Sequence, residues 1–386
     1  MNKQIKLAVA SALLAAASSA NAGIMIPAGD WTLDIGGVVN TYYTYSRTSG
    51  DAVGLGGALE NGYDRSNNIT TGLLPNYLSV SGKTRQNDLD VGFTISINPG
   101  SSTKSAGIQS GTTSGNTSTV ANQENRQAFL TFGDKSWGSI KVGKDLGIFA
   151  SDAILNDMTL LGVGSGAGLL AGNTTTLGRI GTGFIYADWK SQIAYSSPNW
   201  NGFSFTAGIT QAWDAAPTAL FGGVTPQFTG REGAGPAFEA KAAYEWAGDV
   251  GGKVWTSAIT QKFEDNVNGG SERANAWDLG ATVNVAGFGL TGYYYDGKGI
   301  GTTVQFAGGF EADGDRTDSD GGYVQGTYTL PGVGTKLGLS WGVSKLEGDA
   351  VDIENSMWTV GAYHPLTKHL NLVAEYSDVK SEDNAA

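Results

Sequence analysis

The chain has 386 residues, with 24 Lys and Arg against 36 Asp and Glu, which gives a formal net charge of −12. This acidic balance argues against nucleic acid as a partner, because phosphate groups bind to basic surfaces. Cysteine is absent, so disulfides and thiolate-based metal or redox sites are excluded, and we expect neither a metal nor a cofactor.

The first 22 residues are predicted to be a cleaved signal peptide. Lys3 and Lys6 form a positively charged beginning, a short apolar stretch follows, and Ala20-Asn21-Ala22 provides a small-residue cleavage site. The apolar stretch is too short to span a bilayer. The mature protein is therefore expected to be an exported domain over residues 23–386.

Strands with a period of two dominate the chain after residue 22. At 88–97, apolar residues from Leu89 to Ile97 alternate with polar or small residues from Asp88 to Ser96. A strand with this pattern has one apolar and one polar face. Fifteen ranges show the alternation: 31–46, 73–85, 88–97, 125–133, 138–145, 188–197, 203–210, 236–247, 253–264, 276–285, 287–297, 320–330, 336–344, 356–364 and 370–377.

Short and long connections alternate strictly between these strands. Turns such as 85–88, 133–138 and 198–202 are followed by long polar links such as 98–124 and 146–187. A soluble β-sandwich also alternates polar and apolar residues, but it has no reason to segregate its loop lengths. An all-β, transmembrane antiparallel β-barrel does so, with tight periplasmic turns and long extracellular loops around a polar interior.

Aromatic residues cluster at the ends of several predicted strands. Tyrosines occupy 42–43 and 293–295, and Trp358 and Tyr363 lie near the ends of a later strand. Amphipathic rings prefer the membrane–water interface, so these residues are predicted to form aromatic girdles.

Fifteen is an odd strand count, whereas single-chain bacterial barrels carry an even number. We therefore expect 16 strands. The last strand leads into a polar tail from Lys380 to Asn384, which suggests that the C-terminal closing strand is missing. The alternative is that a strand elsewhere has been split or missed.

Several segments resemble the general trimeric porins of Gram-negative outer membranes. Residues 125–133 read NRQAFLTFG and residues 137–144 read WGSIKVGK, which together resemble a pair of strands in that family. Residues 193–203 read IAYSSPNWNGF and resemble a family hairpin. The resemblance implies a homotrimer of 16-stranded barrels in the outer membrane, surrounded by lipids and lipopolysaccharide, with the long third loop folded inward.

The resemblance also implies a charged constriction. In the family, acidic residues of the third loop face basic residues of the barrel wall, and the opposed charges set a transverse field. Here loop 3, residues 146–187, offers Asp157 as the best match to the loop acid and Asp152 as a second candidate.

Basic candidates for the wall come from the neighbouring strands. Lys144 matches a basic residue that ends the fifth strand of the family, but strict alternation with Ile140 and Val142 would point it outward unless a bulge turns it. The remaining basic candidates are Arg126, Lys141, Arg179 and Lys190.

The resemblance implies a water-filled channel for passive diffusion of ions and small hydrophilic solutes. A substrate-specific channel of the same fold is the alternative, and a barrel that does not conduct also stays open. An enzyme is not expected, because catalysis needs a base near a nucleophile. The two histidines, His364 and His369, both flank a predicted periplasmic turn.

Overall fold

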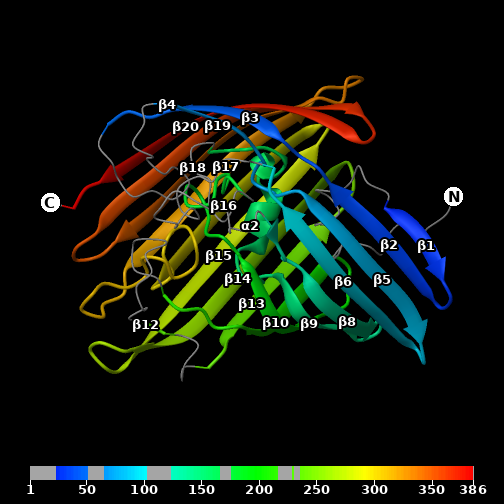
Figure 1. Ribbon diagram of the computed structural model, residues 1–386, viewed down its shortest axis with the longest axis horizontal. Helices are drawn as coiled ribbons and strands as arrows, with labels where there is room; N and C mark the ends of the chain where they lie inside the picture. Colours follow the sequence, from blue (N-terminus) through cyan, green and yellow to red (C-terminus); the bar gives the residue numbers. More distant parts are fainter. Residues whose placement is uncertain are drawn as a thin grey trace, which may run out of the picture.

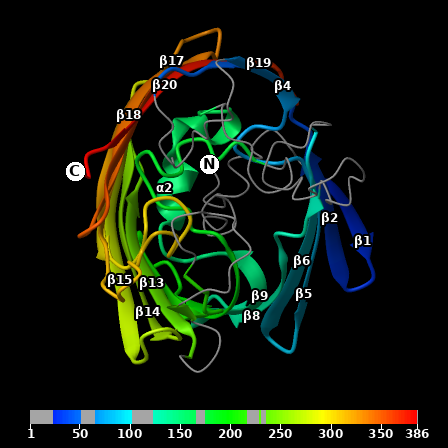
Figure 2. The same ribbon diagram turned by 60° about the vertical axis from the view of Figure 1, so that its left-hand side comes forward.

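A computed structural model describes residues 23–50, 65–101, 123–165, 175–215, 228–229 and 235–385 of the chain. The predicted signal peptide lies outside these residues. In the described parts, eighteen strands form one antiparallel sheet and two more form a separate hairpin. The sheet curls around an interior in which loop 3 lies (Figures 1 and 2).

The strands follow one another around the sheet almost in chain order. They are β1 (Ile24–Ala28), β2 (Trp31–Val38), β5 (Tyr77–Gln86), β6 (Leu89–Pro99), β7 (Gln123–Glu124), β8 (Ala128–Asp134), β9 (Gly138–Leu146), β10 (Trp189–Ser196), β11 (Phe203–Thr210), β12 (Phe228–Thr229), β13 (Ala237–Trp246), β14 (Val250–Asp265), β15 (Ser271–Val285), β16 (Phe288–Lys298), β17 (Asp318–Thr329), β18 (Lys336–Glu347), β19 (Asp352–Thr367) and β20 (Leu370–Asp383). The separate hairpin is β3 (Tyr42–Arg47) with β4 (Arg65–Thr70). Loop 3 contains the helix α2 (Ser151–Asn156) and the 3₁₀ helix η1 (Met158–Leu161).

All fifteen predicted strands have counterparts in the structure, but the count was one too low. The missed strand is β1, whose sequence IMIPA does not alternate. Its Pro27 is tolerated because β1 pairs only with β2 among the described residues, and an edge strand can spare a donor. The range 31–46 also divides into β2 and β3, and β4 lies in a predicted link. Apart from the two-residue strands β7 and β12, the sheet therefore has the expected sixteen strands.

The two ends of the sheet do not meet in the described part of the chain. There, β20 pairs only with β19, and β1 lies well away from β20 in both views (Figures 1 and 2). The β3–β4 hairpin lies toward the β20 end of the sheet. Because the missed strand is β1, the described residues already supply sixteen strands, and the odd count came from a missed strand rather than from a missing C-terminal one.

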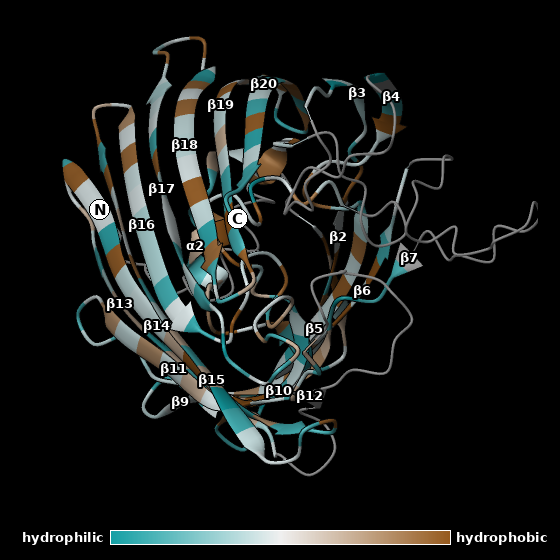
Figure 3. Cartoon of the chain, turned by 90° about the vertical axis from the view of Figure 1, so that its left-hand side faces the viewer, coloured by the Kyte–Doolittle hydropathy of each residue, from teal (hydrophilic) through white to brown (hydrophobic). Residues whose placement is uncertain are grey.

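Alternation separates an apolar outer face from an inner face, and hydrophobic bands run across the strands (Figure 3). On β15, Trp277 and Leu279 are 45% and 50% exposed, whereas Asp278 between them is 0% exposed. Tyr294 and Trp358 are exposed on the outer face, as the girdle prediction requires, and their place at the membrane–water interface stays a prediction. The girdle prediction is wrong for the two neighbours of Tyr294 and for Tyr363, which are buried on the inner face, because successive residues of a strand point to opposite sides.

A hydrophobic core lies inside the curved sheet. It joins loop 3 and the connection after β16 to the inner faces of β14–β17. Phe263 of β14 packs edge-on against Phe306 and Phe310, with ring centroids 5.0 Å apart in both pairs. Two inward loops are therefore packed against one side of the wall. In the described ranges no helix has both the length and the apolar character needed to cross a membrane.

Candidate functional site

The beginning of loop 3 is held by a wall carboxylate. Glu239 on the inner face of β13 accepts hydrogen bonds from the backbone N–H groups of Ile148 and Phe149, both at 2.8 Å. The same carboxylate accepts from Thr210 Oγ1 at 2.7 Å and pairs with Lys190 Nζ at 2.6 Å. Lys190 is thus on the wall as predicted, but its charge is buried and paired. Glu239 was missed, although the phase of its strand points it inward.

A second wall carboxylate holds the far end of the helical segment. Glu375 on β20 accepts hydrogen bonds from the backbone N–H groups of Val163 at 2.7 Å and Gly164 at 2.9 Å. Tyr363 Oη donates to the same carboxylate at 2.5 Å. Loop 3 therefore runs from β13 across to β20, with both ends of its helical part bound by acids of the inner wall.

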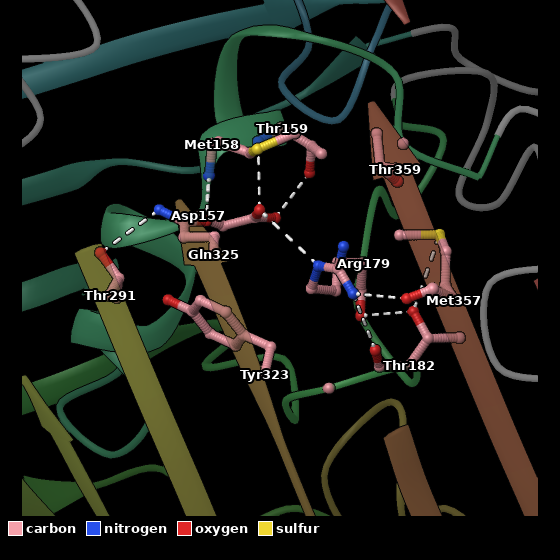
Figure 4. A network of polar contacts seen from close by, with 12 residues as sticks. Asp157, Met158, Thr159, Arg179, Thr182, Thr291, Tyr323, Gln325, Met357 and Thr359 are labelled. Carbon is pink, nitrogen blue, oxygen red and sulfur yellow. Dashed lines mark hydrogen bonds and ion pairs between the residues drawn. The ribbon is translucent and has the colours of Figure 1, made fainter. Parts of the chain in front are cut away.

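The middle of the segment is bound by β17 (Figure 4). Tyr323 Oη donates to the carbonyl of Ala153 at 2.8 Å. Gln325 accepts from the Met158 N–H at 2.8 Å and donates to the carbonyl of Asn156 at 2.6 Å. These bonds satisfy backbone groups at the end of α2 and the start of η1 that the short helices leave without partners.

Asp157 and Arg179 pair with each other inside loop 3 (Figure 4). Asp157 caps η1, accepting from the Thr159 N–H at 3.0 Å, and its carboxylate lies 3.8 Å from Arg179 Nε. Both side chains are 0% exposed, and Arg179 Nη1 donates to the carbonyl of Met357 on β19 at 3.1 Å. Arg179 thus lies on the loop and not on the wall as expected. Burial raises the pKa of Asp157, and the guanidinium offsets this only in part.

Asp152, in the first turn of α2, binds two lysines of the wall. Its carboxylate is 3.1 Å from Lys241 Nζ on β13 and 2.5 Å from Lys253 Nζ on β14. Burial alone would raise the pKa of Asp152, but the two ammonium groups hold it below its ordinary value. The expected encounter of a loop acid with a basic wall therefore occurs here, through two lysines that the sequence analysis did not name.

Arg126 and Lys141 also have partners. Arg126 Nε is 2.8 Å from the Glu124 carboxylate, and its guanidinium lies over the Trp189 ring, 5.6 Å from the centroid. Lys141 forms an ion pair with Asp145. Lys141 belongs to β9 and Arg126 to the short link between β7 and β8, and neither offers an isolated charge.

Lys144 does not belong to the inner wall. It lies opposite Ala128 of β8 and Ser191 of β10, both exposed on the outer face, and it shares its phase with Ile140 and Val142. The pairing of β9 runs through Lys144 without a shift in register, so no bulge turns the side chain inward. The alternation was the better guide, and the motif match was misleading.

Loop 3 itself is almost free of charge. Between residues 147 and 187 only Asp152, Asp157 and Arg179 are charged, and all three are buried. In the part of the loop that the structure describes, the residues at least partly exposed are uncharged: Leu155, Asn156, Leu161, Val163 and Tyr186. The charges therefore act mainly on one another at short range, and their field farther into the lumen is weak.

The chain matches the family model for Gram-negative porins over residues 8–384. Three solved structures are similar in fold. An anion-selective porin from Comamonas acidovorans is 16% identical with a TM-score of 0.59, over 91% of this chain and 90% of that chain. The outer membrane channel DcaP of Acinetobacter baumannii is 15% identical with a TM-score of 0.66, over 94% of both chains. Salmonella typhi OmpF, in complex with daunomycin, is 15% identical with a TM-score of 0.52, over 93% of this chain and 100% of that chain.

None of the curated proteins matches the chain. The match to the family model nevertheless spans almost the whole length. The similarity in fold to the three solved structures covers more than nine tenths of this chain in each case. The chain belongs to the family of Gram-negative porins.

Proposed function

We propose that the protein is an outer-membrane porin for passive diffusion of ions and small hydrophilic solutes, narrowed by loop 3. The observation that carries the proposal is the attachment of loop 3 to the inner wall from Glu239 to Glu375. A segment held at both ends across the interior reduces the space through which solutes pass. The channel is formed by residues 23–386 after export and removal of the signal peptide.

The channel should discriminate weakly between cations and anions. Asp152, Asp157 and Lys190 are all buried in pairs with opposite charges. Paired charges cancel at distances longer than their separation, so they leave little net field for a passing ion. This distinguishes the proposal from a strongly anion-selective or cation-selective pore.

We expect the protein to form a homotrimer among lipids and lipopolysaccharide. OmpT of Vibrio cholerae, which has a similar fold with a TM-score of 0.52, has been solved in a trimer form. The apolar outer face, with residues such as Leu279 and Trp341 half exposed, suits contact with lipid or with a second subunit.

Single-channel conductance in a planar bilayer under a KCl gradient tests the function. We expect stepwise openings in groups of three and a reversal potential close to zero. A folded barrel, recognised by its heat-dependent shift on SDS gels, that conducts no current would refute the open channel. Single openings would refute the trimer alone.

Replacing Asp152 with asparagine should shift the channel toward anions. The substitution removes the counter-charge that Lys241 and Lys253 share at the inner wall, and leaves Lys253 with Glu245 alone, at 3.2 Å. We expect the permeability ratio of chloride to potassium to rise about threefold, measured from the reversal potential under a KCl gradient. Asp378→Asn, which removes an exposed acid of β20, is the matched control and should leave the ratio unchanged.

A further inference from the structure

The side of the wall formed by β5–β11 differs from the side covered by loop 3. On β6, Ile95 and Ile97 are 55% and 42% exposed on the outer face, so Thr94 and Ser96 point inward. On β11, Phe203 and Ile209 are exposed outward. The inner positions of these strands are rich in serine and threonine.

These hydroxyl groups lie next to one another across the strands. Ser81 lies opposite Thr94 with 2.9 Å between the hydroxyl oxygens, and Ser196 lies opposite Thr206 with the same separation. We call the whole inner-face set the hydroxyl track: Ser79, Ser81, Thr94, Ser96, Thr131, Ser139, Ser196, Ser204 and Thr206. All of them except Ser96 are partly exposed.

The hydroxyl track extends along the strands as well as across them. Its members on β5 and β6 lie well away from the turn at Asn87 and Asp88, whereas Ser139 and Ser196 lie beside the short turns after β8 and β10. All of these turns are on the same rim, because consecutive strands are antiparallel. The set therefore slants from the middle of the wall to the rim of short turns.

Most charged residues on the same side of the wall lie in ion pairs. Lys141 pairs with Asp145. Near the rim, Arg85 lies 2.8 Å from both Asp90 and Asp134. The inner positions of β2 and β5 add one acid and one base on adjacent strands, at Asp34 and Lys83.

We propose that the channel favours neutral, hydroxyl-rich solutes of the size of a sugar over ions of equal size, with the hydroxyl track as the surface along which they pass. The inference rests on the proposed diffusion function and names its substrate class. A hydroxyl group both donates and accepts hydrogen bonds, so the track can exchange bonds with sugar hydroxyls in many orientations. Along the track an ion leaving bulk water meets mainly charges that are already paired, and the two inner charges that the described residues leave outside ion pairs, Asp34 and Lys83, are of opposite sign.

Swelling of proteoliposomes containing the full-length protein measures this preference directly. Three solutes of similar size are compared at pH 6: a neutral hexose, the corresponding aldonate anion and the corresponding protonated amino sugar. We expect the hexose to enter about threefold faster than either ion. A factor of this size corresponds to the net free energy of one or two weak hydrogen bonds between the hexose and the track. Faster entry of either ion would overturn the inference.

A variant without the central hydroxyls tests whether the track is responsible. The hexose should reduce the KCl current, and in the combined variant S81A/T94V/S196A/T206V this reduction should require about fivefold more hexose. Ser191 is the matched control, since it is a serine on the exposed outer face of β10. S191A should behave as the unsubstituted protein does.

The results separate the two proposals. A folded protein without KCl current refutes the diffusion function itself. If the combined variant carries a normal KCl current and the hexose reduces this current as much as in the unsubstituted protein, only the role of the track is overturned. If the combined variant does not fold, the single variants S81A and S196A replace it. Each should require about twofold more hexose, and no change in either would also overturn the role of the track.

Discussion

Replacing Glu239 with leucine should destabilise the barrel strongly and release the beginning of loop 3. The change leaves Lys190 as a buried charge without its counter-charge and removes the acceptor of two backbone N–H groups. Breaking a buried pair by removing one partner costs about 3–5 kcal/mol, and each unsatisfied N–H costs about 1–3 kcal/mol more. Urea unfolding in lipid vesicles, followed by tryptophan fluorescence, measures the loss. Single-channel recordings should show increased open-channel noise.

Two further variants separate the ion pair from the loop contacts. The double variant E239L/K190M removes the uncompensated charge, so it should recover part of the stability but retain the current noise. Glu354→Leu is the control, because Glu354 and Lys345 form an exposed pair at 3.4 Å, and such pairs contribute about 0–1 kcal/mol. Stability of E239L equal to that of the unsubstituted protein would contradict a stabilising role for the buried contact between Glu239 and Lys190.

Periodicity predicts the strands of this protein well, because each strand must present one face to lipid and one to the interior. It failed at β1, which is five residues long and apolar throughout. It was also more reliable than local motif similarity, as Lys144 illustrates. The position of a residue along its strand decides which face of the sheet its side chain is on. A match between the residue type and a family motif does not change that face.

The partners of the charged residues could not be predicted in the same way. Asp152 was identified from the sequence, but its lysines come from β13 and β14, 89 and 101 residues further on. Glu239 and Glu375 were missed because their roles depend on backbone groups of loop 3, which carry no sequence signal. The alternation of each strand shows which wall residues point inward and could bind loop 3. The path of loop 3 through the interior decides which of these residues contact the loop.

The pair formed by Asp157 and Arg179 should respond unequally to loss of either member. Arginine stays protonated at any accessible pH, so Asp157→Asn leaves a permanent buried charge and should cost about 3–5 kcal/mol. Arg179→Met leaves a carboxyl group that can become neutral by binding a proton. Burial already raises the pKa of Asp157 in the intact protein, and loss of the guanidinium raises it further.

The difference predicts a pH dependence for Arg179→Met that is steeper than that of the unsubstituted protein and that Asp157→Asn lacks. A carboxyl whose pKa is higher in the folded than in the unfolded protein binds more protons when folded, so stability falls as pH rises from the unfolded to the folded pKa. The R179M variant should therefore be nearly as stable as the unsubstituted protein at about pH 4 and lose stability as the pH rises above the unfolded pKa of about 3.9. Asp157→Asn should show no such recovery at low pH. Urea unfolding midpoints across this range measure both, and parallel curves for the two variants would contradict an ionised pair in the core of loop 3.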